Sequence, residues 1–382
     1  MMLPFSGLFF FYILFIFFIG AIILGILGKP LKWYGFFVNL FMLWLIFGNS
    51  KKNIIILLMF LTGELALVEI YIHIRKHFNN RWILWIMILF SILPLILTKW
   101  GEQLIHRHVA LLGISYLTFK VVQVLIETYD GLIDKMNPLS FTYFLLFFPT
   151  ISSGPIDRSR RFLEDISHVM KKEEYIENLR RGIYKLGKGA FFKFFLGAIV
   201  SNYWMAKIPT DRNFINILNY MYAYSFYLYF DFAGYSFMAV GTSYIFGIKT
   251  PDNFNIPYLS HDIKEFWNRW HMSLSFWFRD FIYTRIVMSF IKNKVFKNKY
   301  TASYIGFIIT MFTMGAWHGT QRHYLVYGLY HGILICFTDY FERKSKWYKS
   351  VKNNEKWDTV FTFVTFNLVC FGFLIFSGKL FI

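Results

Sequence analysis

The stretch Phe5–Leu27, FSGLFFFYILFIFFIGAIILGIL, holds no charged side chain. A helix needs about 20 predominantly apolar residues to cross the hydrocarbon core of a bilayer, so this stretch predicts a membrane-spanning helix. It has no basic segment before it and no small-residue cleavage site, which favours a retained helix over a cleaved signal. Similar apolar runs recur along the chain, for example Asn53–His73 and Trp357–Phe376. We therefore predict an all-α, polytopic membrane protein.

The composition excludes an ordinary soluble protein. Of 382 residues, 56% are hydrophobic and 16% are charged, against about 25% charged in an average soluble domain. The formal net charge of +18 is scattered in short segments between the apolar runs, which is typical of loops that fix membrane orientation. No basic soluble domain is present, so we expect no nucleic acid partner. No internal repeat or linker appears, and we predict one domain over residues 1–382, placed in the cell membrane as a multi-pass protein.

Several segments depart from simple spans. Val109–Tyr129 is rich in polar side chains, and Leu139–Ile151 is shorter than the roughly 20 residues that a span needs. Both predict re-entrant or buried segments. Asp157–Lys193 mixes basic and acidic side chains and predicts amphipathic helices at the membrane interface, and Phe194–Ala206 then predicts the remainder of a span. Tyr258–Tyr283 carries too many charges to be a span and predicts an interfacial or half-inserted helix.

Three carboxylates lie inside otherwise apolar sequence. Intramembrane carboxylates are costly, so we expect Glu64 and Glu69 to face the protein interior and to accept a helix partner or a water. Asp231 is followed by Phe-Ala-Gly-Tyr-Ser236. A carboxylate beside a glycine and a serine in mid-span indicates either the lining of a pocket or a contact that holds two helices together.

Three of the ten histidines stand out from those in polar loops. His318 follows an apolar run and lies between Gly315 and Gly319, whose missing side chains let a ligand approach the imidazole. A neutral imidazole there suits a general base, and a capping or packing histidine is the equal alternative. His271, between a tryptophan and a methionine, favours a packing or hydrogen-bonding role near a site. His331 lies deeper in a predicted span, which favours a structural role as a hydrogen-bond donor between helices. No HExxH-like spacing supports a metal site, so we expect none.

At these residues the chain resembles the membrane-bound O-acyltransferase (MBOAT) family. The matching segments are Phe266–Asp280, FWNRWHMSLSFWFRD, then Trp317-His-Gly319, Asp231–Ser236 and Gly328–Gly332. Within the family the chain resembles the D-alanyl transfer proteins of Gram-positive teichoic-acid modification. Two further segments carry that finer likeness, GISYLTFKVVQV from residue 113 and FPTISSGPIDR from residue 148.

The resemblance implies a ring of about 11 transmembrane helices, with re-entrant and interfacial helices, around a central tunnel. It implies that His318 is the family's catalytic histidine and His271 the second motif histidine. From these motifs and the mid-span carboxylate we expect five further side chains to contact substrate: Trp317, Asp231, Tyr235, Ser236 and Arg269.

The implied activity is O-acyl transfer of D-alanine to a hydroxyl of lipoteichoic acid outside the cell. The implied donor is the phosphopantetheine thioester of an acidic cytoplasmic D-alanyl carrier protein, with no tightly bound cofactor and with a small single-span membrane partner. A thioester is already activated, so transfer needs mainly positioning and removal of the hydroxyl proton. No GxSxG segment is present, so a covalent serine mechanism is not favoured.

Two alternatives remain open. The first is an O-acetyltransferase of the same family that modifies an exopolysaccharide or peptidoglycan, because the segments around His271 and His318 do not separate the two activities. The second is a transporter or channel, with Asp231, Glu64 and Glu69 lining a path.

Overall fold

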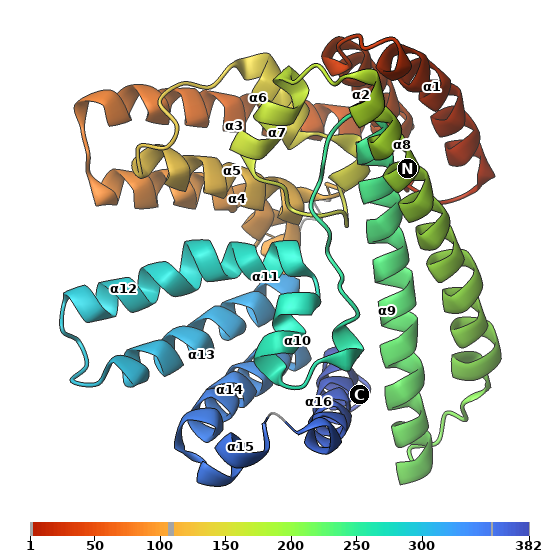
Figure 1. The fold of residues 1–382 in the computed structure, drawn as a ribbon. Coiled ribbons are helices and arrows are strands. Elements are labelled where there is room, and N and C mark those ends of the chain that lie inside the picture. Colours follow the sequence, from red (N-terminus) through yellow and green to blue (C-terminus); the bar gives the residue numbers. More distant parts are fainter. Residues whose placement is uncertain (1–2, 106–110, 353, 382) are drawn as a thin grey trace. The chain divides into compact units, whose positions relative to one another are not determined.

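The computed structural model describes residues 3–105, 111–352 and 354–381, without the side chains of residues 100–105. Over these residues the chain is helical, and its one β contact is an isolated bridge between Phe254 and Trp270 (Figure 1). This confirms the all-α prediction. Within the described part of the chain, four helices are long and apolar enough to cross a membrane: Leu8–Ile26, Lys51–His77, Arg81–Lys99 and Glu355–Phe376. The ring of about 11 spans and the central tunnel stay predictions.

The chain folds into two compact units. Unit 1 comprises Met1–Ala190 and Tyr235–Pro251, and unit 2 comprises Phe191–Gly234 and Asp252–Ile382. The division at Gly234 falls inside a single long helix, α9 (Phe214–Ile245). The single domain over residues 1–382 stays a prediction, and each unit is described by itself below.

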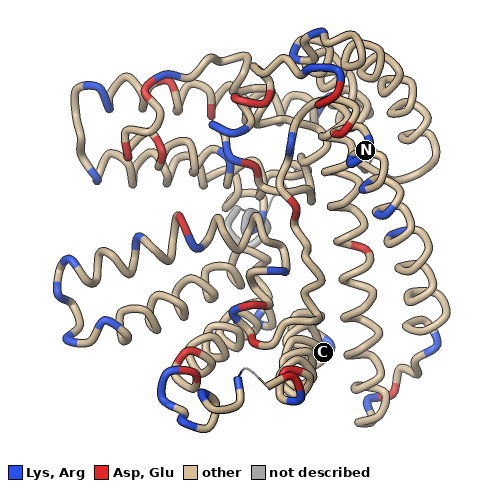
Figure 2. The backbone as a smooth tube through the Cα atoms, in the orientation of Figure 1, with Lys and Arg blue, Asp and Glu red and all other residues tan. Residues whose placement is uncertain are grey.

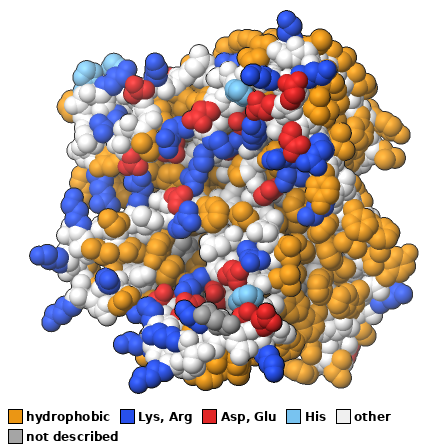
Figure 3. Space-filling model, viewed as in Figure 1, with side chains coloured by type: hydrophobic (Ala, Val, Ile, Leu, Met, Phe, Trp, Pro, Cys, Tyr) orange, Lys and Arg blue, Asp and Glu red, His pale blue; other side chains and the backbone are white. Residues whose placement is uncertain are grey.

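Unit 1 contains the N-terminal helices and the end of α9. Its elements are α1 (Leu8–Ile26), α2 (Lys32–Phe47), α3 (Lys51–His77), α4 (Arg81–Ile105), α5 (Ile114–Tyr129), α6 (Pro138–Leu145), the 3₁₀ turn η1 (Phe148–Thr150), α7 (Ser159–Ser167) and α8 (Lys172–Ala190). Around α1 the surface is dominated by hydrophobic side chains (Figure 3), with Leu8, Tyr12 and Ile16 at least 61% exposed. Such a surface is stable against lipid acyl chains and confirms the apolar first helix as a candidate span.

The buried segments of unit 1 agree with the prediction. In α5 every residue from Tyr116 to Thr128 is buried, although residues 109–110 of the predicted segment lie outside the described residues. The predicted Leu139–Ile151 segment forms α6 and then η1, with Phe148, Pro149 and Thr150 buried. The non-helical backbone at this break is therefore enclosed by protein, as the low tolerance of lipid for unpaired peptide groups requires.

The prediction for the two glutamates of α3 is half wrong. Glu64 is buried, at 3% exposure, whereas Glu69 is exposed. An α-helix turns through about 100° per residue, so side chains five positions apart lie about 140° apart around the axis. The two carboxylates therefore do not share a face, and only Glu64 points into the protein.

The basic segment Asp157–Lys193 forms amphipathic helices, as predicted. In α7 the buried positions are Ser159, Phe162 and Ile166. The predicted boundary at Lys193 is wrong, because α8 continues directly into a π-helical stretch, η2 (Phe191–Gly197). Helices of this wider kind are rare and occur preferentially at functional sites.

Unit 2 contains the remaining elements. They are η2, the π-helix η3 (Val200–Trp204), the 3₁₀ turn η4 (Met205–Lys207), the first part of α9, η5 (Pro257–Leu259), α10 (Ile263–Arg269), α11 (Met272–Phe278), the π-helix η6 (Arg279–Tyr283), α12 (Thr284–Lys292), α13 (Lys299–His318), α14 (Arg322–Lys344), α15 (Lys346–Val351) and α16 (Glu355–Phe376). Helices α12 and α13 form a hairpin whose connection is marked by basic residues (Figure 2).

Helices α13 and α14 pack together through glycines. A Cβ atom on Gly315 would collide with the backbone of Tyr324 and Gly328, and one on Gly328 would collide with the backbone of Met311 and Gly315. Small residues at a crossing let two membrane helices approach closely. The prediction that Gly315 leaves an opening for a ligand is wrong, because α14 fills the space.

The segment Tyr258–Tyr283 is not one interfacial helix, contrary to the prediction. It is broken into η5, α10, α11 and η6. Asp262 caps α10 by accepting hydrogen bonds from the backbone N–H groups of Lys264 and Glu265, which fixes where that helix begins. The chain then turns sharply at His271 before α11 begins.

Candidate active site

His271 lies at the sharp corner between α10 and α11 in unit 2. Its backbone adopts the left-handed conformation, with φ 43° and ψ 52°, and its side chain is buried at 4% exposure. For a residue other than glycine this conformation costs roughly 1–2 kcal/mol. Such strain persists only where the surroundings enforce it, and it clusters at functional sites.

The surroundings that enforce this corner come from the extended chain around Asn253. The N–H of Met272 donates to the carbonyl oxygen of Asn253 at 2.9 Å. The Asn253 side-chain oxygen accepts from Ser273 N at 3.2 Å and from Ser273 Oγ at 2.6 Å. On one side the imidazole of His271 packs edge-on against Phe232, with ring centroids 4.7 Å apart. The segment around Asn253 therefore holds the backbone that follows His271, and Phe232 packs on its ring.

His318 is the last residue of α13 and is half-buried among aromatic rings. Its ring centroid lies 4.5 Å from that of Trp317 and 4.8 Å from that of Phe376 in α16. A helix C-terminus carries partial negative charge, which stabilises a protonated imidazole. The position thus combines partial access with a place at the C-terminal end of a helix.

Helix α16 contacts the surroundings of both histidines. Phe373 packs against Trp270, the residue before His271, with ring centroids 4.8 Å apart. Phe376, three positions further along and so on the same face of α16, packs against His318. The two motif histidines, 47 positions apart in sequence, thus belong to one unit, and one face of α16 contacts His318 and the residue before His271.

Similarity to known proteins identifies the family of the chain. The family model of the membrane-bound O-acyltransferases matches residues 86–378. The chain belongs to the membrane-bound O-acyltransferase family. It is 45% identical to a teichoic acid D-alanyltransferase of Bacillus subtilis, over 99% of this chain and 98% of that protein. It is 40% identical to a protein of the same name from Streptococcus thermophilus, over 87% of this chain and 84% of that protein. A probable alginate O-acetylase of Pseudomonas aeruginosa is 32% identical over 74% of this chain and 52% of that protein.

Three of the five expected substrate contacts of this acyltransferase lie in unit 2. Trp317 is half-buried beside His318. Arg269 lies at the end of α10, where its guanidinium donates to Glu265 at 2.6 Å. Asp231 of α9 pairs with Lys193 of the π-helix η2. Arg269 and Asp231 are therefore held in ion pairs, and Trp317 is the one of the three that packs directly on a motif histidine.

The other two expected contacts, Tyr235 and Ser236, lie in unit 1. The Tyr235 hydroxyl and Ser152 Oγ share a hydrogen bond of 2.6 Å, and Ser236 is buried at 1% exposure. Ser152 belongs to the loop from residue 148 to 158 that carries the finer family likeness. Tyr235 therefore connects α9 to that loop.

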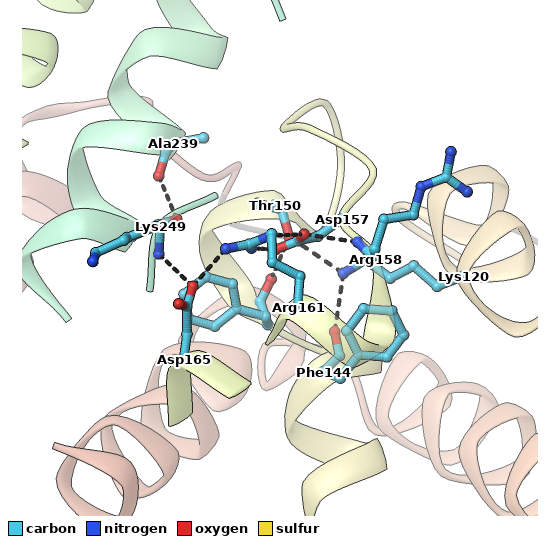
Figure 4. Close-up of polar contacts among 11 residues, drawn as sticks. Lys120, Phe144, Thr150, Asp157, Arg158, Arg161, Asp165, Ala239 and Lys249 are labelled. Atoms are coloured by element: carbon cyan, nitrogen blue, oxygen red, sulfur yellow. Dashed lines mark hydrogen bonds and ion pairs between the residues drawn. The ribbon is translucent and has the colours of Figure 1, made fainter. Parts of the chain in front are cut away.

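A buried lysine for which the sequence predicted no role organises the same loop (Figure 4). Lys120 of α5 is 1% exposed, and its ammonium donates to the carbonyl oxygens of Phe144 at 3.0 Å and Leu145 at 3.3 Å and to Thr150 Oγ1 at 3.2 Å. These carbonyls end α6, so Lys120 caps that helix and fixes η1. A lone lysine within an apolar run was the signal that could have revealed it.

The far end of the loop is held by a second set of charged contacts (Figure 4). Asp157, 2% exposed, accepts from Arg158 N at 2.7 Å and from Arg161 Nε at 2.8 Å. Arg161 also pairs with Asp165 at 2.5 Å, and Asp165 accepts from Lys249 N at 2.7 Å. Charge-assisted bonds of this kind are the stronger class of hydrogen bond, and together they make the loop a rigid element of unit 1.

Proposed function

We propose that this acyltransferase moves D-alanine from the phosphopantetheine thioester of an acidic cytoplasmic carrier protein to hydroxyl groups of lipoteichoic acid outside the cell. One observation carries the proposal. The likeness to the Bacillus subtilis teichoic acid D-alanyltransferase extends over 99% of this chain and 98% of that protein. The likeness to the Pseudomonas aeruginosa protein covers 52% of that protein. The organisms of the full-length relatives fit a Gram-positive cell membrane.

In the proposed mechanism His318 is the general base. Its imidazole removes the proton of the acceptor hydroxyl while the hydroxyl oxygen attacks the thioester carbonyl carbon. The tetrahedral intermediate collapses to the new ester, the carbon–sulfur bond breaks, and the carrier's thiolate leaves and takes the proton back from the His318 imidazolium. The C-terminus of α13 favours the imidazolium that exists between these steps. His271, buried and rigidly directed, supports the reacting groups from the neighbouring corner.

The side chains expected to contact substrate are held in different ways. Trp317 packs on His318 and offers a flat apolar surface beside the reacting atoms. Arg269, Asp231, Tyr235 and Ser236 are proposed to orient polar parts of the substrates. The ion pairs and hydrogen bonds of Arg269, Asp231 and Tyr235 give these side chains fixed directions, which is what positioning requires.

The proposed carrier fits the basic surface of unit 2. The connection between α12 and α13 carries Lys294 and Lys297, and Lys292 and Lys299 lie at the helix ends on either side of it (Figure 2). Complementary charge speeds encounter with an acidic protein and orients it. The phosphopantetheine arm arrives with the carrier, so no tightly bound cofactor is needed. A small single-span membrane partner that receives or presents the acceptor completes the proposal.

The experiment that tests this function uses the full chain reconstituted in vesicles with a carrier loaded with radiolabelled D-alanine. We expect ester-linked D-alanine on lipoteichoic acid with the wild type and none with His318→Ala. His168→Ala, which changes an exposed histidine of unit 1 paired with Glu174, is the matched control and should transfer normally. D-alanine transfer by His318→Ala would remove His318 from the mechanism.

The second candidate is O-acetylation of a polysaccharide, favoured by the 32% identity to the probable alginate O-acetylase. Loss of cell-wall acetate, with D-alanine esters unchanged, on deletion of the gene would favour it and exclude the D-alanine proposal. Movement of solute without any acyl transfer would instead indicate the transporter alternative.

A further inference from the structure

His331 of α14 lies where three helices of unit 2 meet. It is fully buried, at 0% exposure. Its ring packs edge-on against Trp267 of α10, with centroids 5.2 Å apart, and against Tyr327 one turn earlier in α14, with centroids 4.7 Å apart. A Cβ atom on Gly372 of α16 would collide with His331 Nε2. The imidazole therefore fills the junction of α10, α14 and α16, and Gly372 leaves room for it.

Three buried polar atoms at this junction lack hydrogen-bond partners among the described residues. Within the described part of the chain, neither ring nitrogen of His331 nor Trp267 Nε1 has a hydrogen-bond partner. Buried polar atoms are normally bonded, and leaving one unbonded costs free energy. A phenylalanine would fill the same space without that cost. Three such atoms lie on two side chains in contact, and a small polar group at this junction would meet their hydrogen-bonding needs.

The junction is connected to both motif histidines. Tyr327 packs on His331 and also on His318, with ring centroids 6.3 Å apart in the second contact. Trp267 lies in α10, the short helix that leads directly to the His271 corner. Rings from Trp267 through His331 and Tyr327 to His318 are thus in continuous contact, and a shift at His331 would move the elements that carry both histidines.

We propose that His331 is a positioning residue for acyl transfer, which holds a water molecule together with Trp267 and thereby fixes α10 against α14. A neutral imidazole has one donor and one acceptor nitrogen, and an indole has a donor only. One water can accept from Trp267 Nε1 and donate to the acceptor nitrogen of His331, which satisfies two of the three atoms. The inference rests on the proposed roles of His271 and His318, because His331 would affect the reaction by keeping the spacing between these two histidines.

The test separates ring shape from hydrogen bonding. His331→Phe keeps the ring and removes both nitrogens, His331→Gln keeps a donor and an acceptor, and Trp267→Phe removes the indole donor. Since a misplacement of about 1 Å can cost ~10²-fold in rate, we expect His331→Phe to lower kcat by that order with KM for carrier and acceptor unchanged. His331→Gln should recover most of the rate. The double variant with Trp267→Phe should be no slower than His331→Phe alone, because both remove the same bridge.

The control is Tyr330→Phe, which removes a hydrogen bond of 2.9 Å to the Leu368 carbonyl from the residue next to His331 and should keep the wild-type kcat. Each variant is compared after gel filtration, so that only folded protein is assayed. A wild-type kcat in His331→Phe would overturn the proposal, as would equal losses in His331→Phe and His331→Gln.

Failure of the proposed function is a separate result. If the wild type moves acetyl groups instead of D-alanine, the D-alanine proposal fails, and the same variants are then compared with the acetyl donor. The ratio of variant to wild-type kcat tests His331 with either donor.

Discussion

The side-chain oxygen of Asn253 accepts two hydrogen bonds from Ser273, one from its N–H at 3.2 Å and one from its hydroxyl at 2.6 Å. Asn253 is 1% exposed and lies 20 positions before its partner. These bonds hold the first turn of α11, and with it the left-handed backbone of His271. The position of a candidate catalytic group therefore depends on an asparagine outside the motif that contains it.

Replacement of this asparagine tests that dependence. In Asn253→Ala the N–H and hydroxyl of Ser273 lose a buried acceptor, at a cost of about 1–3 kcal/mol. We expect a lower melting temperature in detergent and a fall in acyl transfer. Asn253→Asp, which keeps the acceptor oxygen, is the control for the hydrogen bonds and should retain more transfer than the alanine variant. Equal transfer in both variants would contradict the role of these bonds.

The backbone strain at His271 gives a second prediction. Glycine adopts the left-handed conformation without the steric cost that other residues bear. His271→Gly should therefore be more stable than His271→Ala by roughly 1 kcal/mol, and neither should transfer at the wild-type rate. Melting temperatures and transfer rates measured on the same preparations check both statements. A glycine variant less stable than the alanine variant would show that the corner is not strained.

A third prediction concerns the buried ammonium of Lys120. Lys120→Met fits the space but leaves the acceptors at the end of α6 without their donor, and each buried unsatisfied group costs about 1–3 kcal/mol. We expect a lower melting temperature and faster proteolysis between residues 148 and 158. Lys135→Met, an exposed lysine of the same unit, should change stability by no more than about 0.5 kcal/mol. Unchanged proteolysis of Lys120→Met would exclude the capping role.

A fourth prediction concerns the crossing of α13 and α14. Gly315→Ala places a methyl group against the backbone of Tyr324 and Gly328, and overpacking of this kind typically costs about 1–3 kcal/mol. Because His318 ends the same helix, transfer should fall as well. Gly63→Ala is the matched control, since a Cβ atom there meets nothing within 4 Å, and it should be neutral or slightly stabilising. A Gly315→Ala protein as active as Gly63→Ala would contradict the close packing.

The local pattern of apolar and polar residues predicted the helices well but did not predict the sharp turns between them. The uncharged run that forms α1 and the polar segment that forms α5 were both recognised, because length and side-chain type decide whether a helix faces lipid or protein. The break at His271 was missed because its cause, Asn253, acts across intervening chain. Gly315 was misinterpreted because a glycine at a helix crossing and a glycine beside a ligand look alike until the second helix is seen.

The sequence identified the two motif histidines, and the structure shows which contacts surround them. His318 and His271 belong to the same unit. The sequence predicted no role for Lys120 or Asn253, and it predicted His331 as a structural interhelical donor without identifying Trp267 as its neighbour. Each acts by pairing with atoms far away in the chain, and no spacing rule in one sequence reveals such pairs.

The face of α16 that carries Phe373 and Phe376 has a practical consequence for inhibition. A small molecule that binds between this face and the rings it touches would disturb the His318 imidazole, which contacts Phe376, and Trp270 beside His271 at the same time. Resistance to such a compound should arise through substitutions in the last helix, at positions that take no part in the chemistry.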